Sequence, residues 1–156
     1  MKPESISTIK KELLSLPPDK LAEYCLRMAK YKVENKEFLS YLIFQAYDEE
    51  TYIREVKTEI DTQFKNLNKS KTFLAKKTVR KVLKTTQKFI KFSGEKTTEI
   101  ELLLYFCRKL KTSGLALRYG SVMGNLYMRQ VERIRKVLAS LHEDLQLDYV
   151  NEVERL

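Results

Sequence analysis

The sequence predicts an all-α fold, and three observations support this prediction. Apolar residues recur at three- and four-residue spacing through most of the 156 residues, which is the period of an amphipathic helix. Only four glycines and three prolines punctuate the chain, and this scarcity favours few long helices over many short strands. No segment alternates apolar and polar residues for long enough to indicate a strand. We expect about seven helices joined by short loops as antiparallel hairpins.

Two helices are predicted before residue 32. The first follows a Ser5 cap and ends at Pro17-Pro18. The second begins with Pro18 in its first turn, where a proline costs no hydrogen bond. Each has an apolar stripe that we expect to face the core. The stripes consist of Ile6, Ile9, Leu13 and Leu16 in the first helix and Leu21, Tyr24, Cys25, Met28 and Tyr31 in the second.

The third predicted helix follows a cap at Asn35 and contains the run from Phe38 to Phe44. That run is apolar on nearly every side, which is typical of a buried helix, so we expect it to be central. Acidic residues from Asp48 to Glu50 mark the start of a fourth helix. Its apolar stripe has 3-4-4-3 spacing and consists of Ile53, Val56, Ile60, Phe64 and Leu67.

The fifth and sixth helices are separated by a short break. The fifth runs from about Lys71 to Phe92 and ends near Gly94, because glycine readily adopts the backbone conformation that terminates a helix. Residues 98–101 fit a capping box, which begins the sixth helix. The sixth contains the second all-round apolar run, residues 102–107, and is expected to be the other central element.

A last helix begins near Ser121, after a loop or short turn between Gly114 and Gly120. Its apolar side extends through Leu145, and it either continues to Leu156 or breaks near Asp148. The chain has the length of one domain and no linker-like composition divides it, so we predict a single helical domain spanning residues 1–156.

Composition excludes several classes of site. Cys25 and Cys107 are isolated in the sequence, which argues against a disulfide framework or a zinc site and favours two small core residues. His142 is the only histidine and is expected on a solvated helix face. We therefore predict no metal, no cofactor and no catalytic residue; the alternative is an enzyme with an unrecognised site. No secretory signal or membrane-spanning run is visible, so we expect a cytoplasmic protein without membrane insertion.

The positive charge of the chain is concentrated in one segment. The formal net charge is +9, and residues 62–94 hold ten Lys or Arg and no acid, whereas the segments on either side are nearly balanced. Within the predicted fifth helix, five lysines step by 4-3-4-3 and one arginine lies beside them, so the cations share one helix face about 21 Å long. They are Lys77, Arg80, Lys81, Lys84, Lys88 and Lys91.

This face predicts a binding surface for an acidic protein partner or another polyanion. An alternative is non-specific binding to a nucleic-acid backbone, because lysine outnumbers arginine and base readout is not indicated. A second alternative is that the face is merely solvated. A shorter basic row, Arg129, Arg133 and Lys136, is spaced 4-3 on the last helix and would form a groove with the first if packing brought the two together.

One stretch resembles a known repeat architecture. Residues 16–21, Leu-Pro-Pro-Asp-Lys-Leu, through residues 34–39, Glu-Asn-Lys-Glu-Phe-Leu, resemble one helix-turn-helix unit of HEAT-type or tetratricopeptide-type proteins. No second copy at a fixed period is found in the sequence. The resemblance implies an α-solenoid-like right-handed superhelix and a non-catalytic protein-binding or nucleic-acid-binding scaffold. An irregular helical bundle is the alternative fold.

Overall fold

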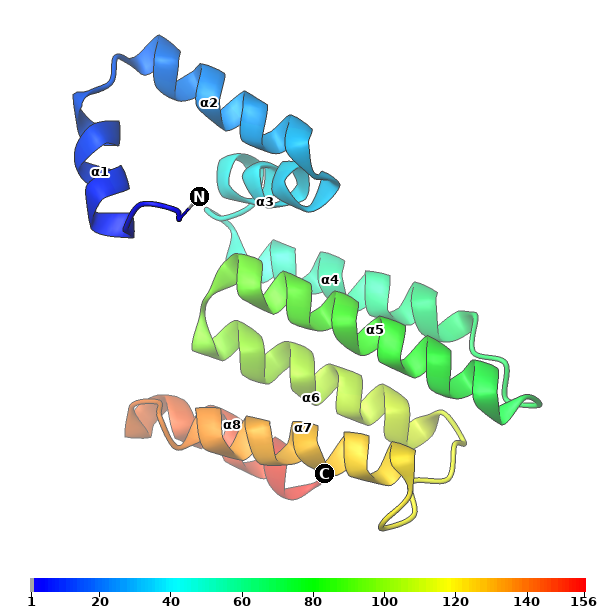
Figure 1. Cartoon of the computed structure of the whole chain (residues 1–156). Coiled ribbons are helices and arrows are strands. Elements are labelled where there is room, and N and C mark those ends of the chain that lie inside the picture. The colour runs from blue at the N-terminus through cyan, green and yellow to red at the C-terminus, as the bar shows by residue number, and fades with distance from the viewer. Residues whose placement is uncertain (1) are drawn as a thin grey trace. The chain divides into compact units, whose positions relative to one another are not determined.

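The computed structural model describes residues 2–156, and these form eight helices and no strand (Figure 1). The all-α prediction is therefore confirmed. The chain divides into two compact units, the first ending at Gln45 and the second beginning at Ala46. The two units are described separately below.

The first unit contains α1 (Ile6–Ser15), α2 (Pro18–Tyr31) and α3 (Val33–Phe44). The predicted Ser5 cap is confirmed, since the Thr8 amide donates to Ser5 Oγ at 3.2 Å. Pro18 is the first residue of α2, also as predicted. The predicted Asn35 cap is wrong: α3 begins two residues earlier, and the Asn35 side chain instead donates to the Met28 carbonyl at 2.9 Å. This bond ties α3 back to the end of α2.

Burial in the first unit differs from the prediction. Among residues 2–45 only Tyr41 is buried, and Phe44, in the run expected to be central, is 67% exposed. The apolar stripes of α1 and α2 are also largely exposed, Cys25 included. An amphipathic pattern states which side of a helix would be buried, but three short helices enclose too little volume to bury it. The expectation of a central third helix is wrong for this reason.

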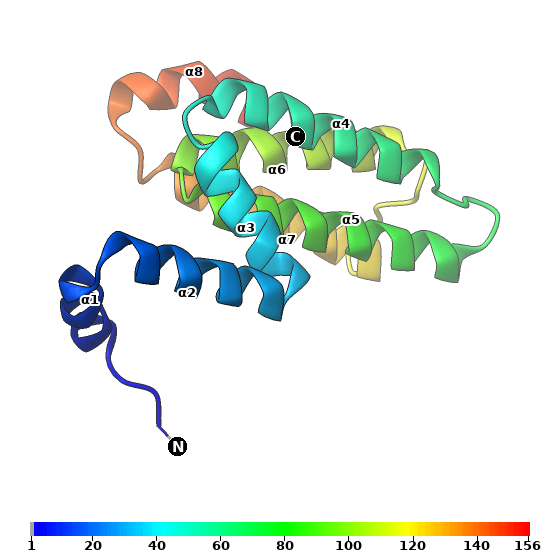
Figure 2. The same ribbon diagram turned by 90° about the horizontal axis from the view of Figure 1, so that it is seen from above.

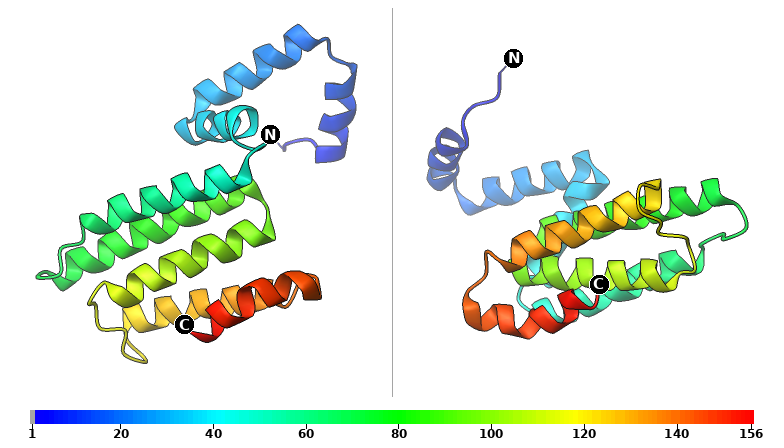
Figure 3. Two further views of the ribbon diagram at one scale, coloured as in Figure 1. Left: turned by 180° about the vertical axis from the view of Figure 1, so that it is seen from behind. Right: turned by 90° about the horizontal axis from the view of Figure 1, so that it is seen from below.

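The second unit has two layers of alternating antiparallel helices. They are α4 (Glu49–Lys65), α5 (Thr72–Ser93), α6 (Lys96–Thr112), α7 (Val122–Leu138) and α8 (Glu143–Glu154). One layer holds α4, α6 and α8, and the other holds α5 and α7 (Figures 2 and 3). Helix α6 packs against α4, α5 and α7. Its prediction as a central element is confirmed by its buried residues Ile100, Leu102, Leu103, Leu104, Phe106, Cys107 and Leu110.

Three predicted helix ends in this unit are confirmed. The Thr51 amide donates to Asp48 Oδ1 at 3.1 Å at the start of α4, and the Gly124 amide donates to Ser121 Oγ at 3.0 Å at the start of α7. At the end of α5, Gly94 has a φ of 73° and donates to the Ile90 carbonyl at 2.9 Å. The left-handed backbone at this position explains why a glycine terminates the helix.

Two other predicted boundaries are wrong. The capping box fails because α6 begins at Lys96, and buried Thr98 donates through Oγ1 to Glu49 Oε1 at 2.6 Å instead of capping its own helix. The last helix is interrupted at residues 139–142 rather than continuing or breaking near Asp148. The reversal there is what allows α8 to lie antiparallel to α7 in the opposite layer (Figure 3). The additional helix accounts for eight helices in place of about seven.

A constant sequence separation recurs in the layer of α4, α6 and α8. These helices begin at residues 49, 96 and 143, so each start lies 47 residues after the previous one. Polar contacts between neighbouring helices of the layer repeatedly join residues 44 positions apart. The pairs include Lys57 with Glu101 at 2.8 Å, Asp61 with Tyr105 at 2.8 Å, and Glu152 with Arg108. Thr51 and Ile53 recur as Thr98 and Ile100, but most other positions 47 residues apart carry different residue types, so the repeat is not visible in the sequence.

Candidate functional site

The six cations of the predicted face all lie on α5, and we call them the lysine face: Lys77, Arg80, Lys81, Lys84, Lys88 and Lys91. The opposite side of α5 is buried and includes Ala75, Val79, Val82, Leu83, Thr86 and Ile90. Burial of that side holds the helix in place, and its 3.6-residue period directs the cations outward. All members of the lysine face are exposed except Lys88, which is half-buried.

The exposed members of the lysine face have no acidic partner among residues 2–156. Within residues 2–156, no ion pair joins any acid to Lys77, Arg80, Lys81, Lys84 or Lys91. Elsewhere in the second unit some cations are paired, as Lys57 is with Glu101 and Lys109 is with Asp61, at 2.8 and 2.7 Å. Acids within residues 2–156 therefore leave these five exposed cations without an ion pair.

Lys88 differs from the other members of the lysine face. Its ammonium group lies 4.8 Å from the centre of the Phe89 ring and 5.9 Å from that of Phe92. An ammonium held over aromatic rings gains a cation–π attraction and loses freedom to reach a ligand. Lys88 is therefore partly structural, and the exposed cations on either side of it are better placed to bind.

The second predicted basic row is divided by an ion pair. Arg133 donates through Nε and Nη2 to the two oxygens of Glu99 at 2.5 and 3.0 Å, and this hydrogen bonding raises the pKa of the guanidinium. Arg129 is exposed and donates to the Asn125 carbonyl at 3.2 Å, and Lys136 is exposed. Because Glu99 neutralises its middle member, the row does not act as a second continuous cationic stripe.

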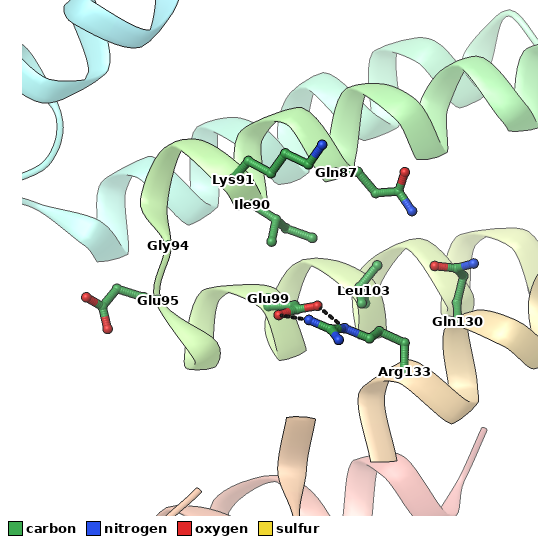
Figure 4. A pocket seen from close by; sticks show the side chains of 9 residues that line it. All are labelled: Gln87, Ile90, Lys91, Gly94, Glu95, Glu99, Leu103, Gln130 and Arg133. Carbon is green, nitrogen blue, oxygen red and sulfur yellow. Dashed lines mark hydrogen bonds and ion pairs between the residues drawn. The ribbon is translucent and has the colours of Figure 1, made fainter. Parts of the chain in front are cut away.

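The two rows meet at one place. A cleft of about 450 Å³ lies between α5 and α7, with α6 at its bottom (Figure 4). It is lined by Lys91 from the lysine face and Arg133 from the second row. Glu95 and Glu99 line the same cleft, so its cations and acids balance. The predicted cation-lined groove is thus reduced to a short, charge-balanced cleft at the end of the lysine face.

Charge is divided between the two layers of the second unit. Helix α5 carries seven Lys or Arg and no acid, and α7 carries four and one acid. In the other layer, α8 carries five acids and no base, α4 carries five acids and three bases, and α6 carries two acids and four bases. The layer of α5 and α7 is therefore the basic side of the unit. This division could not be seen in the sequence, because the helices of the two layers alternate along the chain.

Polar contacts join the helices of the layer that holds α4, α6 and α8. Tyr105 and Lys109 of α6 both donate to Asp61 of α4, at 2.8 and 2.7 Å. Partial burial opposes ionisation of Asp61, but the hydrogen bonds from Lys109 and Tyr105 outweigh it and lower the pKa of this carboxyl. Several charges of this layer therefore join its helices, whereas the five exposed cations of the lysine face form no ion pair within residues 2–156.

The two cysteines lie in different surroundings. Cys107 lies in the core, as predicted, and burial raises the pKa of its thiol to about 12. Cys25 is exposed on α2, so its prediction as a core residue is wrong. His142 is exposed, as expected, and accepts at 3.4 Å from the Asp144 amide at the start of α8.

We expect the two thiols to react at very different rates. A thiol reagent at neutral pH should modify Cys25 within minutes and leave Cys107 unmodified in the folded protein, because the thiolate is the reactive form and Cys107 is both buried and protonated. Titration should give one reactive thiol per chain in buffer and two in denaturant. Two reactive thiols in buffer would show that the α6 core opens readily.

Within residues 2–156 no group of His, Cys, Asp or Glu is arranged to hold a metal ion, and no helix is long and apolar enough to cross a membrane. No protein-family model, curated protein or solved structure matches the chain. Any inference about a helical repeat or about a role of the lysine face therefore rests on the residues and geometry of this chain alone.

Proposed function

We propose that the protein is a non-catalytic helical-repeat scaffold. Its lysine face binds a polyanion by contacting the negative charges along the backbone of that polyanion. The observation that carries the proposal is the set of five exposed cations on α5 that have no ion pair within residues 2–156. Like charges at helical spacing repel one another, so an uncompensated row is a cost to the free protein that a polyanion would relieve.

The repeat part of the proposal is supported by the second unit. Helix starts 47 residues apart and contacts 44 residues apart are what a stack of similar helix pairs would produce, and HEAT-type repeats have periods of about 40–47 residues. Alternating helices in two layers fit an α-solenoid-like arrangement better than a closed bundle (Figure 2). Such scaffolds present one helix layer to a partner.

The composition of the lysine face favours a phosphate backbone over a protein partner. Protein interfaces are depleted in lysine and draw their affinity from aromatic and arginine anchors in pockets. The lysine face has five lysines, and its single arginine is Arg80. Lysine acts as a point charge without the planar fork that reads base edges, so we propose binding to a nucleic-acid backbone without base specificity.

Titration of labelled nucleic acid at several salt concentrations tests the proposal. Five phosphate contacts predict a log–log salt slope of about −4 to −5 and a loss of affinity of about 10²–10³-fold between 50 and 200 mM salt. Duplex DNA and duplex RNA should show similar slopes, and single strands a shallower slope of about −3 to −4. Polyglutamate provides the comparison for an acidic protein.

No binding of nucleic acid at about 50 mM salt would reject a phosphate-backbone ligand. Tighter binding of polyglutamate than of DNA at equal charge would assign the lysine face to an acidic protein instead. Nearly equal binding of DNA sequences that differ in composition is expected, because Arg80 is the single side chain of the lysine face with the planar guanidinium that suits base readout.

A further inference from the structure

A second cationic feature lies at the end of the second unit where α5 and α7 begin. It is a cavity of about 360 Å³ between two loops, residues 66–71 and 113–121, and the first turns of these two helices. The two loops lie at the same end of the helices in Figures 1 and 3. The cavity shares no residue with the lysine face or with the cleft of Figure 4.

The charged residues that line this cavity are all basic. They are Lys69 from the first loop, Lys76 from α5 and Arg118 from the second loop, and no Asp or Glu lines it. Within residues 2–156 none of the three forms an ion pair. Three unpaired cations around one cavity favour a ligand with more than one negative charge.

Close contacts hold the wall of the cavity in place. A Cβ on Gly124 would lie 2.0 Å from the Arg118 carbonyl oxygen, so this glycine lets the second loop pack against the first turn of α7. Ser121 Oγ donates to the same carbonyl at 2.7 Å and accepts from the Gly124 amide at 3.0 Å. The backbone of Arg118 is therefore fixed from two directions.

The first loop also approaches the second loop, at Gly114. Gly114 has a φ of 81°, and a Cβ there would lie 3.7 Å from the Lys69 ammonium nitrogen. The head of Lys69 therefore reaches across to the second loop. The positive φ at residue 114, and not the space beside Lys69, is what favours glycine at this position.

We propose that this cavity binds a phosphate monoester carried on a sugar-sized group. A dianionic phosphoryl group suits three cations, and the Arg118 guanidinium can donate to two of its oxygens at once. The volume exceeds that of a bare phosphate and lies at the lower end of small-ligand clefts. Leu115, Val122 and Met123 provide apolar wall for the attached group, and Thr72 provides a hydroxyl.

Two sources could present this chemistry: a free sugar phosphate, or the phosphorylated end of a strand that lies along α5. The second source is geometrically available because Lys76 lies one helical turn before Arg80, a member of the lysine face. The proposal itself does not depend on the lysine face, since the two features have separate residues. Charge reversal on the lysine face should therefore leave binding of a free sugar phosphate unchanged.

Binding of ribose 5-phosphate to the full chain, measured by calorimetry and amide NMR shifts in a chloride buffer, tests the proposal. We expect ribose 5-phosphate to bind at least about tenfold more tightly than ribose and to shift the amides of Gly114, Val122 and Met123. The double variant Lys76→Gln, Arg118→Gln should weaken binding by about tenfold or more. The matched variant Lys77→Gln, Arg80→Gln removes the same charge outside the cavity and should change binding less than about twofold.

The proposal for the free ligand would be overturned if ribose and ribose 5-phosphate bound with equal affinity. It would also be overturned if the two double variants weakened the binding of ribose 5-phosphate equally. Short DNA with a 5′-phosphate and the same DNA with a 5′-hydroxyl then distinguish the source. A preference for the phosphorylated end that disappears in Lys76→Gln, Arg118→Gln supports the strand-end source. If neither ribose 5-phosphate nor the phosphorylated end is preferred, the cavity is not a phosphate site.

Discussion

Charge reversal of Lys81 and Lys84 together is expected to abolish most polyanion binding while leaving the fold unchanged. Both side chains are exposed and unpaired within residues 2–156, so the substitutions remove no core contact. Replacing two phosphate contacts by two repulsions should weaken DNA binding by about 100-fold at 50 mM salt and reduce the salt slope by about two. The melting temperature should stay the same or rise slightly, because repulsion along α5 is relieved.

The control for this experiment is the reversal of Lys10 and Lys11, which are exposed on α1. This variant changes the net charge by the same amount but leaves the lysine face intact, so it should bind DNA with nearly the slope of the natural chain. Equal loss in the two variants would mean that net charge, rather than the lysine face, governs binding. Replacement of Lys81 and Lys84 by arginine should preserve binding.

Replacement of Phe106 by alanine should be the most destabilising of the changes considered. Phe106 is fully buried in α6, and its ring centre lies 5.9 Å from that of Phe64. Removal of a buried phenylalanine ring leaves a cavity and costs about 3–5 kcal/mol, which is a large part of the stability of an ordinary domain. Urea unfolding followed by circular dichroism should show the midpoint shifting strongly to lower urea.

Phe44→Ala provides the matched comparison. Phe44 belongs to the other all-round apolar run, but its side chain is 67% exposed at the end of α3. The same substitution there should change the free energy of unfolding by less than about 0.5 kcal/mol. Similar losses in both variants would show that α3 is buried in solution, as its sequence pattern predicted.

These two phenylalanines illustrate what periodicity can and cannot predict. The runs around Phe44 and Phe106 are both apolar on nearly every side, and local physics gives both the same preference for burial. Only α6 has helices on enough sides to cover it. Burial of a whole helix is a property of its neighbours, which lie far away in the sequence.

Helix ends divide in the same way. The caps at Ser5, Asp48, Gly94 and Ser121 could be predicted because each depends on atoms within a few residues. The Thr98 capping box failed because the Thr98 hydroxyl has a better-placed acceptor in Glu49, on a different helix. A local motif gives way when tertiary packing supplies a competing partner.

The sequence by itself determined the helical class and the lysine face, because a 3.6-residue period on one helix fixes which side chains share a face. Tertiary structure alone decided which charged side chains form ion pairs with residues far away in the sequence. Glu99 neutralises Arg133 across 34 residues, whereas no acid of residues 2–156 pairs with the exposed cations of the lysine face. It also decided that Lys69, Lys76 and Arg118 surround one cavity, because the approach of two loops depends on how α4 to α7 pack and not on any local pattern.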